Sequence, residues 1–223
     1  MIEISTAPCV MVANGPDVAV KALRDAVARG GTVIGVDGGA RCLRSLGLRP
    51  HIVTGDFDSL SEDERGLLAG FGARIVPTPD QDYTDLDKAL AYAVTTLEAR
   101  EILLFGATGG RLDHLFSVLS ALIKYGRRAE VRLIGTHGET ALVNGVFRRS
   151  GADLPGRVLS LLAMGPVDGI TMRGVRWPLT EESLAPGVRD GTSNEITAET
   201  VEITARSGDL LVFISHDDRR AQP

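Results

Sequence analysis

The sequence has few cysteines and no excess of positive charge, and each shortage excludes a class of protein. Its two cysteines, Cys9 and Cys42, lie too far apart to match a zinc motif or a redox pair. We therefore expect reduced structural thiols in a cytoplasmic protein. The net charge of −5 argues against a nucleic-acid partner, because such binding needs a basic surface.

Long hydrophobic runs are also missing. No apolar stretch reaches the roughly 18–20 residues that span a bilayer, and the first residues lack the basic start and apolar stretch of a secretory signal. We therefore expect no membrane association. Apolar residues make up 43% of the chain and charged residues 24%, which is typical of a globular protein with a buried core.

The first part of the chain alternates short apolar runs with amphipathic segments. Strands are expected over residues 9–13, 32–36, 51–54, 73–76, 101–105 and 129–134. Helices are expected over residues 17–29, 40–46, 61–70, 84–97 and 113–125. This alternation predicts an α/β domain with a doubly wound, mostly parallel sheet. In that architecture, ligands bind outside the carboxyl ends of the strands.

The pattern changes near residue 140, where turns become frequent and long helices disappear. Short strands are expected over residues 140–143, 145–148, 157–163, 169–172, 195–205 and 209–214. This pattern predicts a small antiparallel β-domain. We place the α/β domain at residues 1–138 and the β-domain at residues 139–223.

Acidic residues and glycines gather where strands of the first domain are expected to end. Asp37-Gly38-Gly39 follows the second strand, Gly55-Asp56-Phe57-Asp58-Ser59 follows the third, and residues 80–85 precede the long helix. Each motif alone is more often a turn or a helix cap than a site. Together, carboxylates at one sheet edge repel each other unless a cation joins them. Mg²⁺ prefers such oxygen ligands, so these positions predict a magnesium site.

A glycine-rich turn follows the strand over residues 101–105. Gly106, Gly109 and Gly110 allow backbone N–H groups to approach phosphate oxygens near the start of the next helix. Arg111 can contact phosphate with two hydrogen bonds, although an exposed loop arginine is an equal alternative. The turn is neither a Walker A sequence nor a GxGxxG motif, so alone it is a weak phosphate signal.

These blocks, in order and spacing, resemble the signature segments of thiamine pyrophosphokinases. The resemblance includes the segments 37–39, 55–59, 80–85 with Lys88, and 106–114, and it continues at 176–179 and 192–195. It spans roughly residues 35–215 and implies an α/β catalytic domain, a β-sandwich domain and a homodimer. It also implies active sites between subunits, with ATP as co-substrate, Mg²⁺ as cofactor and thiamine as acceptor.

The resemblance also implies roles for individual residues. It assigns the metal–phosphate chemistry to Asp56, Asp58, Asp82, Asp85, Arg111 and Asp113. Within this group, the implied metal ligands are Asp56, Asp58, Asp85 and Asp113. ATP binding is implied for Asp37, Gly38, Gln81, Thr84, Lys88, Gly109 and Arg111. Thiamine binding is implied for Trp177, Ser193 and Asn194.

The chemistry of thiamine gives a separate reason to consider Trp177. An aromatic face suits a cationic heteroaromatic substrate. In the alternative interpretation, the only tryptophan has a structural role and packs in the core of the β-domain. Its neighbours Arg176 and Pro178 are typical of a loop, which favours the substrate-binding interpretation. Ser193 and Asn194 can hydrogen-bond an aminopyrimidine edge, although without the resemblance an ordinary turn is the simpler interpretation.

Three other functions remain open at this point. A pyrophosphokinase for a different hydroxymethyl heterocycle, such as a pterin, would share the catalytic domain. A nucleotide- or thiamine-binding regulatory module would not need the carboxylate cluster. A metal-dependent phosphohydrolase would place an activated water where the alcohol binds. In the favoured function, Asp82 or Asp113 accepts the proton of the thiamine hydroxyl.

Overall fold

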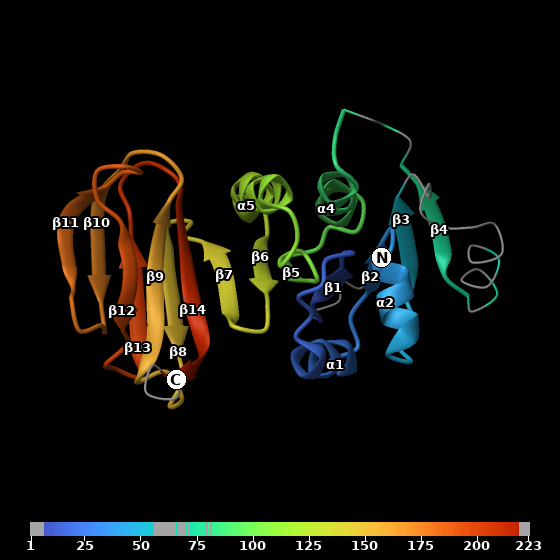
Figure 1. Ribbon diagram of the computed structural model, residues 1–223, viewed down its shortest axis with the longest axis horizontal. Helices are drawn as coiled ribbons and strands as arrows, with labels where there is room; N and C mark the ends of the chain where they lie inside the picture. The colour runs from blue at the N-terminus through green and yellow to red at the C-terminus, as the bar shows by residue number, and fades with distance from the viewer. Residues whose placement is uncertain are drawn as a thin grey trace. The chain divides into compact units, whose positions relative to one another are not determined.

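The computed structural model describes residues 7–55, 66, 70, 72–78, 80 and 82–218 (Figure 1). The chain divides into two compact units, Met1–Thr136 and His137–Pro223. The sequence placed this division between residues 138 and 139. Among the described residues, no helix is long and apolar enough to span a membrane.

The first unit is built on a parallel sheet. Its strands are β1 (Cys9–Val12), β2 (Val33–Val36), β3 (Ile52–Gly55), β4 (Arg74–Pro77), β5 (Glu101–Phe105) and β6 (Glu130–Ile134). Within this unit they lie in the order β6-β5-β1-β2-β3-β4, and every neighbouring pair is parallel. Burial on both faces explains why β1 and β2 are continuous apolar runs rather than alternating ones, and why all four residues of β3 are buried.

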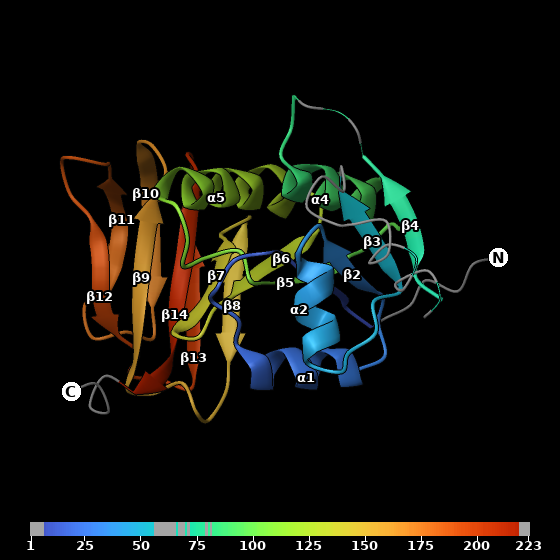
Figure 2. The same cartoon turned by 45° about the vertical axis from the view of Figure 1, so that its right-hand side comes forward.

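Helices cover both faces of this sheet. They are α1 (Val20–Ala28), α2 (Gly39–Ser45), α4 (Asp85–Thr95) and α5 (Leu112–Gly126). In Figures 1 and 2, α1 and α2 lie on one face, and α4 and α5 lie on the other. On the first face, Leu23 and Ala26 of α1 pack with Val10, Val12 and Phe105. The expected helix over residues 61–70 lies outside the described residues except at 66 and 70.

The second unit is a sandwich of antiparallel strands. One layer pairs β7 (Gly138–Leu142), β14 (Leu210–Asp218), β9 (Arg157–Ala163) and β12 (Gly191–Glu195). The other layer has the order β11-β10-β13-β8, with β8 (Val146–Ser150), β10 (Val167–Arg173), β11 (Leu179–Leu184) and β13 (Thr200–Thr204). Leu159, Leu161, Ile170, Ile203 and Val212 belong to its shared core.

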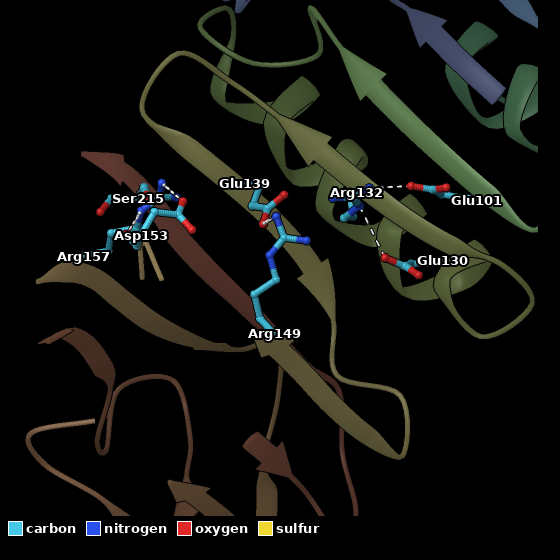
Figure 3. A network of polar contacts seen from close by, with 8 residues as sticks. All are labelled: Glu101, Glu130, Arg132, Glu139, Arg149, Asp153, Arg157 and Ser215. Atoms are coloured by element: carbon cyan, nitrogen blue, oxygen red, sulfur yellow. Dashed lines mark hydrogen bonds and ion pairs between the residues drawn. The ribbon is translucent and has the colours of Figure 1, made fainter. Parts of the chain in front are cut away.

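Charged side chains join neighbouring strands in both units (Figure 3). In the first unit, Arg132 of β6 pairs with Glu101 of β5. In the second unit, Arg149 of β8 lies 3.2 Å from Glu139 of β7 and so connects the two layers. The observed fold confirms the prediction of an α/β domain followed by an antiparallel β-domain.

The expected continuous strand over residues 195–205 is wrong. β12 ends at Glu195 and β13 begins at Thr200 in the other layer of the sandwich. Between them, Ile196 is fully buried, and the Thr197 N–H donates to the Gly174 carbonyl at 2.9 Å. A segment that passes from one layer to the other cannot pair with the same neighbouring strand along its whole length. Its residues nevertheless still alternate between polar and apolar.

The burial of Phe105 generates the first prediction. Phe105 is fully buried in the first unit, whereas Phe116 is 65% exposed on α5. We expect Phe105→Ala to lower the free energy of unfolding by about 3–5 kcal/mol, because it leaves a cavity. The matched control Phe116→Ala should change it by less than about 0.5 kcal/mol. Urea unfolding followed by circular dichroism measures both, and equal losses would contradict the proposed core.

Candidate active site

The strand order of the first unit creates a site at the carboxyl ends of β1 and β5. From β1 the chain builds β2, β3 and β4 on one side, and then places β5 and β6 on the other side. Ligands of doubly wound sheets bind at this change of direction. The turn over residues 14–17 follows β1 and the turn over residues 106–111 follows β5. They meet where the Gly15 N–H donates to the Gly106 carbonyl at 2.6 Å.

The glycine-rich turn has a backbone that other residues rarely adopt. Gly106 has φ +62° and Gly109 has φ +83°. A Cβ atom on Gly106 would also lie 2.7 Å from the carbonyl oxygen of Ala13. Gly106 is buried in this packing, whereas Gly109 and Gly110 are exposed and carry no side chain that could cover their N–H groups, as phosphate binding by backbone requires.

The turn after β2 is held in an equally unusual conformation. Asp37 has φ +46°, and its N–H donates to the Thr54 carbonyl at 2.7 Å. Gly38 is packed so closely that an added Cβ would lie 2.3 Å from Cγ of Asn14. Hence Asp37 and Gly38, for which the resemblance implies ATP binding, are held close to the turn that follows β1.

The segment before α4 is ordered by its own polar groups. Thr84 is the N-cap of α4, and its side chain accepts from the Asp87 N–H at 3.2 Å. Oδ1 of Asp80 accepts from the Asp82 N–H at 2.8 Å. The side chain of Asp82 is exposed. The segment therefore presents Asp82 and Asp85 at the positive end of α4. Gln81 lies outside the described residues.

Lys88 is the main link between α4 and this segment. Its ammonium group donates to the carbonyls of Thr78, at 2.6 Å, and Asp80, at 2.8 Å. It also lies 2.9 Å from Oδ1 of Asp85, and the Lys88 side chain is only 10% exposed. The ammonium group of Lys88 therefore has three oxygen neighbours within the chain, two carbonyls and one carboxylate.

Arg111 and Asp113 form an exposed ion pair at the start of α5. Nε of Arg111 donates to Oδ1 of Asp113 at 3.1 Å, and Nη2 donates to Oδ2 at 2.6 Å. These hydrogen bonds lower the pKa of Asp113 to about 2, and the same pairing raises the pKa of Arg111. Asp113 is consequently a carboxylate at neutral pH.

The predicted metal site is only partly within the described residues. Asp56 and Asp58 lie outside them, and the described ranges contain no group of three acidic, His or Cys side chains placed to hold a metal. Asp85 and Asp113 supply carboxylate oxygens, which suit Mg²⁺. Oδ1 of Asp85 is buried and accepts no hydrogen bond within that part of the chain, although Lys88 lies beside it.

The second unit brings together all three residues predicted to bind thiamine. Oδ1 of Asn194 accepts from the Trp177 N–H at 3.2 Å, and Nδ2 donates to the Trp177 carbonyl at 2.7 Å. Asn194 is 7% exposed, and Oδ1 also accepts from the Glu195 N–H at 2.8 Å. Asn194 thus anchors the backbone of Trp177.

Trp177 and Ser193 are presented to solvent around that anchor. The Trp177 side chain is 50% exposed, so the core interpretation of the tryptophan is wrong. The Arg176 guanidinium lies 5.0 Å from the centre of the Trp177 ring. Ser193 has φ +62° at a break in the register between β12 and β9, and its side chain is exposed. A non-glycine residue held in this conformation is typical of a functional site.

Sequence reasoning missed the turn over residues 14–17 and the anchoring role of Asn194. The turn was visible as Asn-Gly-Pro at the end of the first expected strand, but it matches no phosphate motif. The Asn194 contacts could not be found, because they join residues on separate strands.

Comparison with known proteins identifies the family. A protein-family model with the description "Thiamin pyrophosphokinase, catalytic domain" matches residues 23–134. The model described as thiamin pyrophosphokinase, vitamin B1 binding domain, matches residues 148–210. A thiamine pyrophosphokinase of Bacillus subtilis is 29% identical over 82% of this chain and 87% of its own length. One from rice is 30% identical over 75% of this chain but spans 66% of the rice protein.

Solved structures agree with these matches. The thiamin pyrophosphokinase of Geobacillus thermodenitrificans superposes with a TM-score of 0.81 at 31% identity, over 95% of this chain and 98% of that one. That of Bacillus subtilis gives a TM-score of 0.82 at 27% identity, over 94% and 99%. The fold is therefore that of a two-domain transferase of the kinase type.

The chain belongs to the thiamine pyrophosphokinase family. This membership confirms the resemblance drawn from the signature segments, and it supports the predicted function, thiamine pyrophosphokinase activity in thiamine diphosphate synthesis.

The ion pair at the start of α5 generates the second prediction. In Arg111→Gln, the pKa of Asp113 should rise from about 2 towards its ordinary 3.8. Because the folded-state pKa is depressed, the pair stabilises the fold above the ordinary pKa, and that contribution is lost as pH falls through about 2. A carboxyl-detected NMR titration measures the pKa. Arg24→Gln, which removes a contact to the Leu46 carbonyl, should leave it unchanged. An unshifted Asp113 in Arg111→Gln would show that the pair does not form in solution.

The anchoring of Trp177 generates the third prediction. We expect Asn194→Ala to lower the free energy of unfolding by about 1–3 kcal/mol, because it leaves buried backbone groups without partners. Ser193→Ala, which removes an exposed hydroxyl beside it, should change stability by less than about 0.5 kcal/mol. Thermal unfolding distinguishes the two variants. Equal stability of Asn194→Ala and the unmodified protein would show that the anchor is not formed.

Proposed function

We propose that this chain transfers the pyrophosphoryl group of ATP to the hydroxyl of thiamine, giving thiamine diphosphate and AMP. One observation carries the proposal: a turn of glycines with positive φ lies at the switch point of a parallel sheet, beside Arg111 and Asp113. Exposed backbone, a guanidinium and carboxylates suit a metal-bound polyphosphate. Family membership supports the same substrate pair.

The reaction needs little covalent chemistry from the protein. The thiamine oxygen forms a bond to the β-phosphorus of ATP, and the bond from that phosphorus to the oxygen of the α-phosphate breaks. AMP leaves with that oxygen, and the hydroxyl proton passes to a carboxylate. Positioning and charge neutralisation supply most of the catalysis in such transfers.

The first unit would bind ATP. Backbone N–H groups of the turn at Gly109 and the guanidinium of Arg111 would hold phosphate oxygens. Asp37, Gly38, Gln81 and Thr84 complete the proposed ATP site. Lys88 already contacts three oxygens of the chain, so we propose that it serves the site by holding residues 78–85 against α4.

Mg²⁺ would be held by Asp56, Asp58, Asp85 and Asp113. When bound, the ion would neutralise phosphate charge. Asp113 is proposed as a metal ligand, so its carboxylate would be engaged with the ion. We therefore propose that Asp82, which is exposed beside the N-cap of α4, accepts the hydroxyl proton.

The second unit would bind thiamine. The exposed ring of Trp177 offers a face for the cationic heterocycle, a contact worth about 1 kcal/mol or more when desolvated. Ser193 presents a hydroxyl from its constrained backbone, and Asn194 holds Trp177 in place.

The proposal extends to a homodimer and to a cytoplasmic location. Light scattering during gel filtration tests the dimer. The free thiols of Cys9 and Cys42 suit a reducing compartment, and burial raises the pKa of Cys9 to about 12, which keeps it unreactive.

The fourth prediction concerns the products. With ATP and Mg²⁺, the purified protein should form AMP only when thiamine is present, with an equal amount of thiamine diphosphate. AMP without thiamine would indicate a phosphohydrolase. Thiamine binding without turnover would indicate a regulatory module. If thiamine neither binds nor reacts, a pterin alcohol becomes the acceptor to test.

A carboxylate variant makes this experiment specific to the proposed site. Asp56→Asn should lower kcat by about 100-fold or more, because it removes a proposed metal ligand. Asp25→Asn, on the exposed side of α1, is the matched control and should keep full activity. Near-normal turnover of Asp56→Asn would refute the metal assignment.

A further inference from the structure

The turn over residues 14–17, which we call the β1 turn, has no role in the site proposed so far. Its sequence is Asn14-Gly15-Pro16-Asp17, and it precedes the segment that matches the catalytic family model. Nevertheless, it lies between the two turns proposed to bind ATP, because β1 is placed between β2 and β5 in the sheet.

Backbone contacts join the β1 turn to the glycine-rich turn. The Gly15 N–H donates to the Gly106 carbonyl at 2.6 Å, and the Asp17 N–H donates to the Thr108 carbonyl at 3.4 Å. A Cβ atom added to Gly109 would lie 3.1 Å from Cβ of Asp17. The two turns are therefore packed backbone to backbone, so a shift of one displaces the other.

The Asp17 side chain closes this arrangement. Its Oδ2 accepts from the Thr108 hydroxyl at 2.6 Å, and its Oδ1 accepts from the Thr136 N–H at 2.9 Å. One carboxylate thus connects the turns that follow β1, β5 and β6. Gly135 leaves room for this carboxylate, since an added Cβ there would lie 2.5 Å from Oδ2.

Both oxygens of the Asp17 carboxylate are used in these contacts, one with the Thr108 hydroxyl and one with the Thr136 N–H. An asparagine could keep both contacts, because its oxygen accepts from the N–H and its amide can donate to the hydroxyl oxygen of Thr108, whereas an alanine loses both. The hydroxyl and the N–H also direct positive dipole ends towards the carboxylate. This offsets the repulsion that a negative charge near bound phosphate would otherwise produce.

We propose that Asp17 is a positioning residue for ATP. It fixes Thr108, and through Thr108 the backbone of Gly106–Arg111, in the conformation that presents N–H groups to phosphate. Asp17 contacts no reacting atom in this role. The inference rests on the proposed function, because it specifies how the phosphate-binding turn of that site keeps its shape.

The test is Asp17→Ala in the full-length protein, because alanine loses the contacts to both Thr108 and Thr136. The KM for ATP should rise by about 10- to 100-fold, because small displacements of a positioning element have effects of that size. The KM for thiamine should change by less than about twofold. Calorimetric titration with Mg-ATP, without thiamine, should show a matching loss of affinity, which is a readout independent of turnover.

Thr108→Val provides the second variant. Valine keeps the size of threonine but cannot donate to Oδ2 of Asp17, so its effect on the KM for ATP should resemble that of Asp17→Ala. If the two residues act as one unit, the double variant should be no worse than the more impaired single variant. Thr108→Val also decides the question if Asp17→Ala fails to fold.

Asp25→Ala is the matched control, because Asp25 is exposed on α1 and pairs with Lys21. Unchanged ATP affinity in both Asp17→Ala and Thr108→Val would overturn the proposal. A lower kcat with an unchanged KM for ATP, in proportion to the folded fraction, would also overturn it in favour of a purely structural role. Failure of the unmodified protein to form thiamine-dependent AMP would refute the proposed function, while the titrations would still report on Asp17.

Discussion

The contact between the turns that follow β1 and β5 is the constraint on which the first unit's site depends. The Gly15 N–H and the Gly106 carbonyl are 2.6 Å apart, and neither residue has room for a Cβ. This approach is possible because parallel pairing of β1 with β5 ends both strands at the same edge. The glycines of the two turns therefore serve two purposes: Gly15 and Gly106 permit the close packing, and Gly109 and Gly110 leave exposed backbone.

In the second unit, a side chain rather than a glycine holds the residue proposed to bind substrate. Trp177 lies in a connection between strands, where its backbone has few ladder partners, and Asn194 supplies the missing acceptor and donor. A buried amide that replaces backbone hydrogen bonds holds a half-exposed aromatic ring, over which the Arg176 guanidinium lies. In both units, therefore, the group proposed to contact substrate is exposed, and the group that holds it is buried or packed.

Periodicity predicted most of the fold, because helices and parallel strands leave distinct apolar patterns in the sequence. It failed over residues 195–205, since alternation continues across the point where the chain changes layers. Site residues on short motifs, such as Thr84 and Asp113, could be proposed from their positions after strands or before helices. The roles of Asp17 and Asn194 could not, because each depends on contacts with residues distant in sequence.

The two cationic side chains of the first unit's proposed site already have partners. Arg111 is paired with Asp113, and Lys88 with two carbonyls and Asp85. ATP bound as proposed would compete with Asp113 for Arg111, and that pair is exposed, so separating it costs little. Lys88 is nearly buried, and its removal from Thr78 would leave a carbonyl without a partner. Binding should consequently rearrange the side chain of Arg111 while the segment held by Lys88 stays in place. The proposed site thus has one cationic side chain that can change partners, Arg111, and one that stays in place, Lys88.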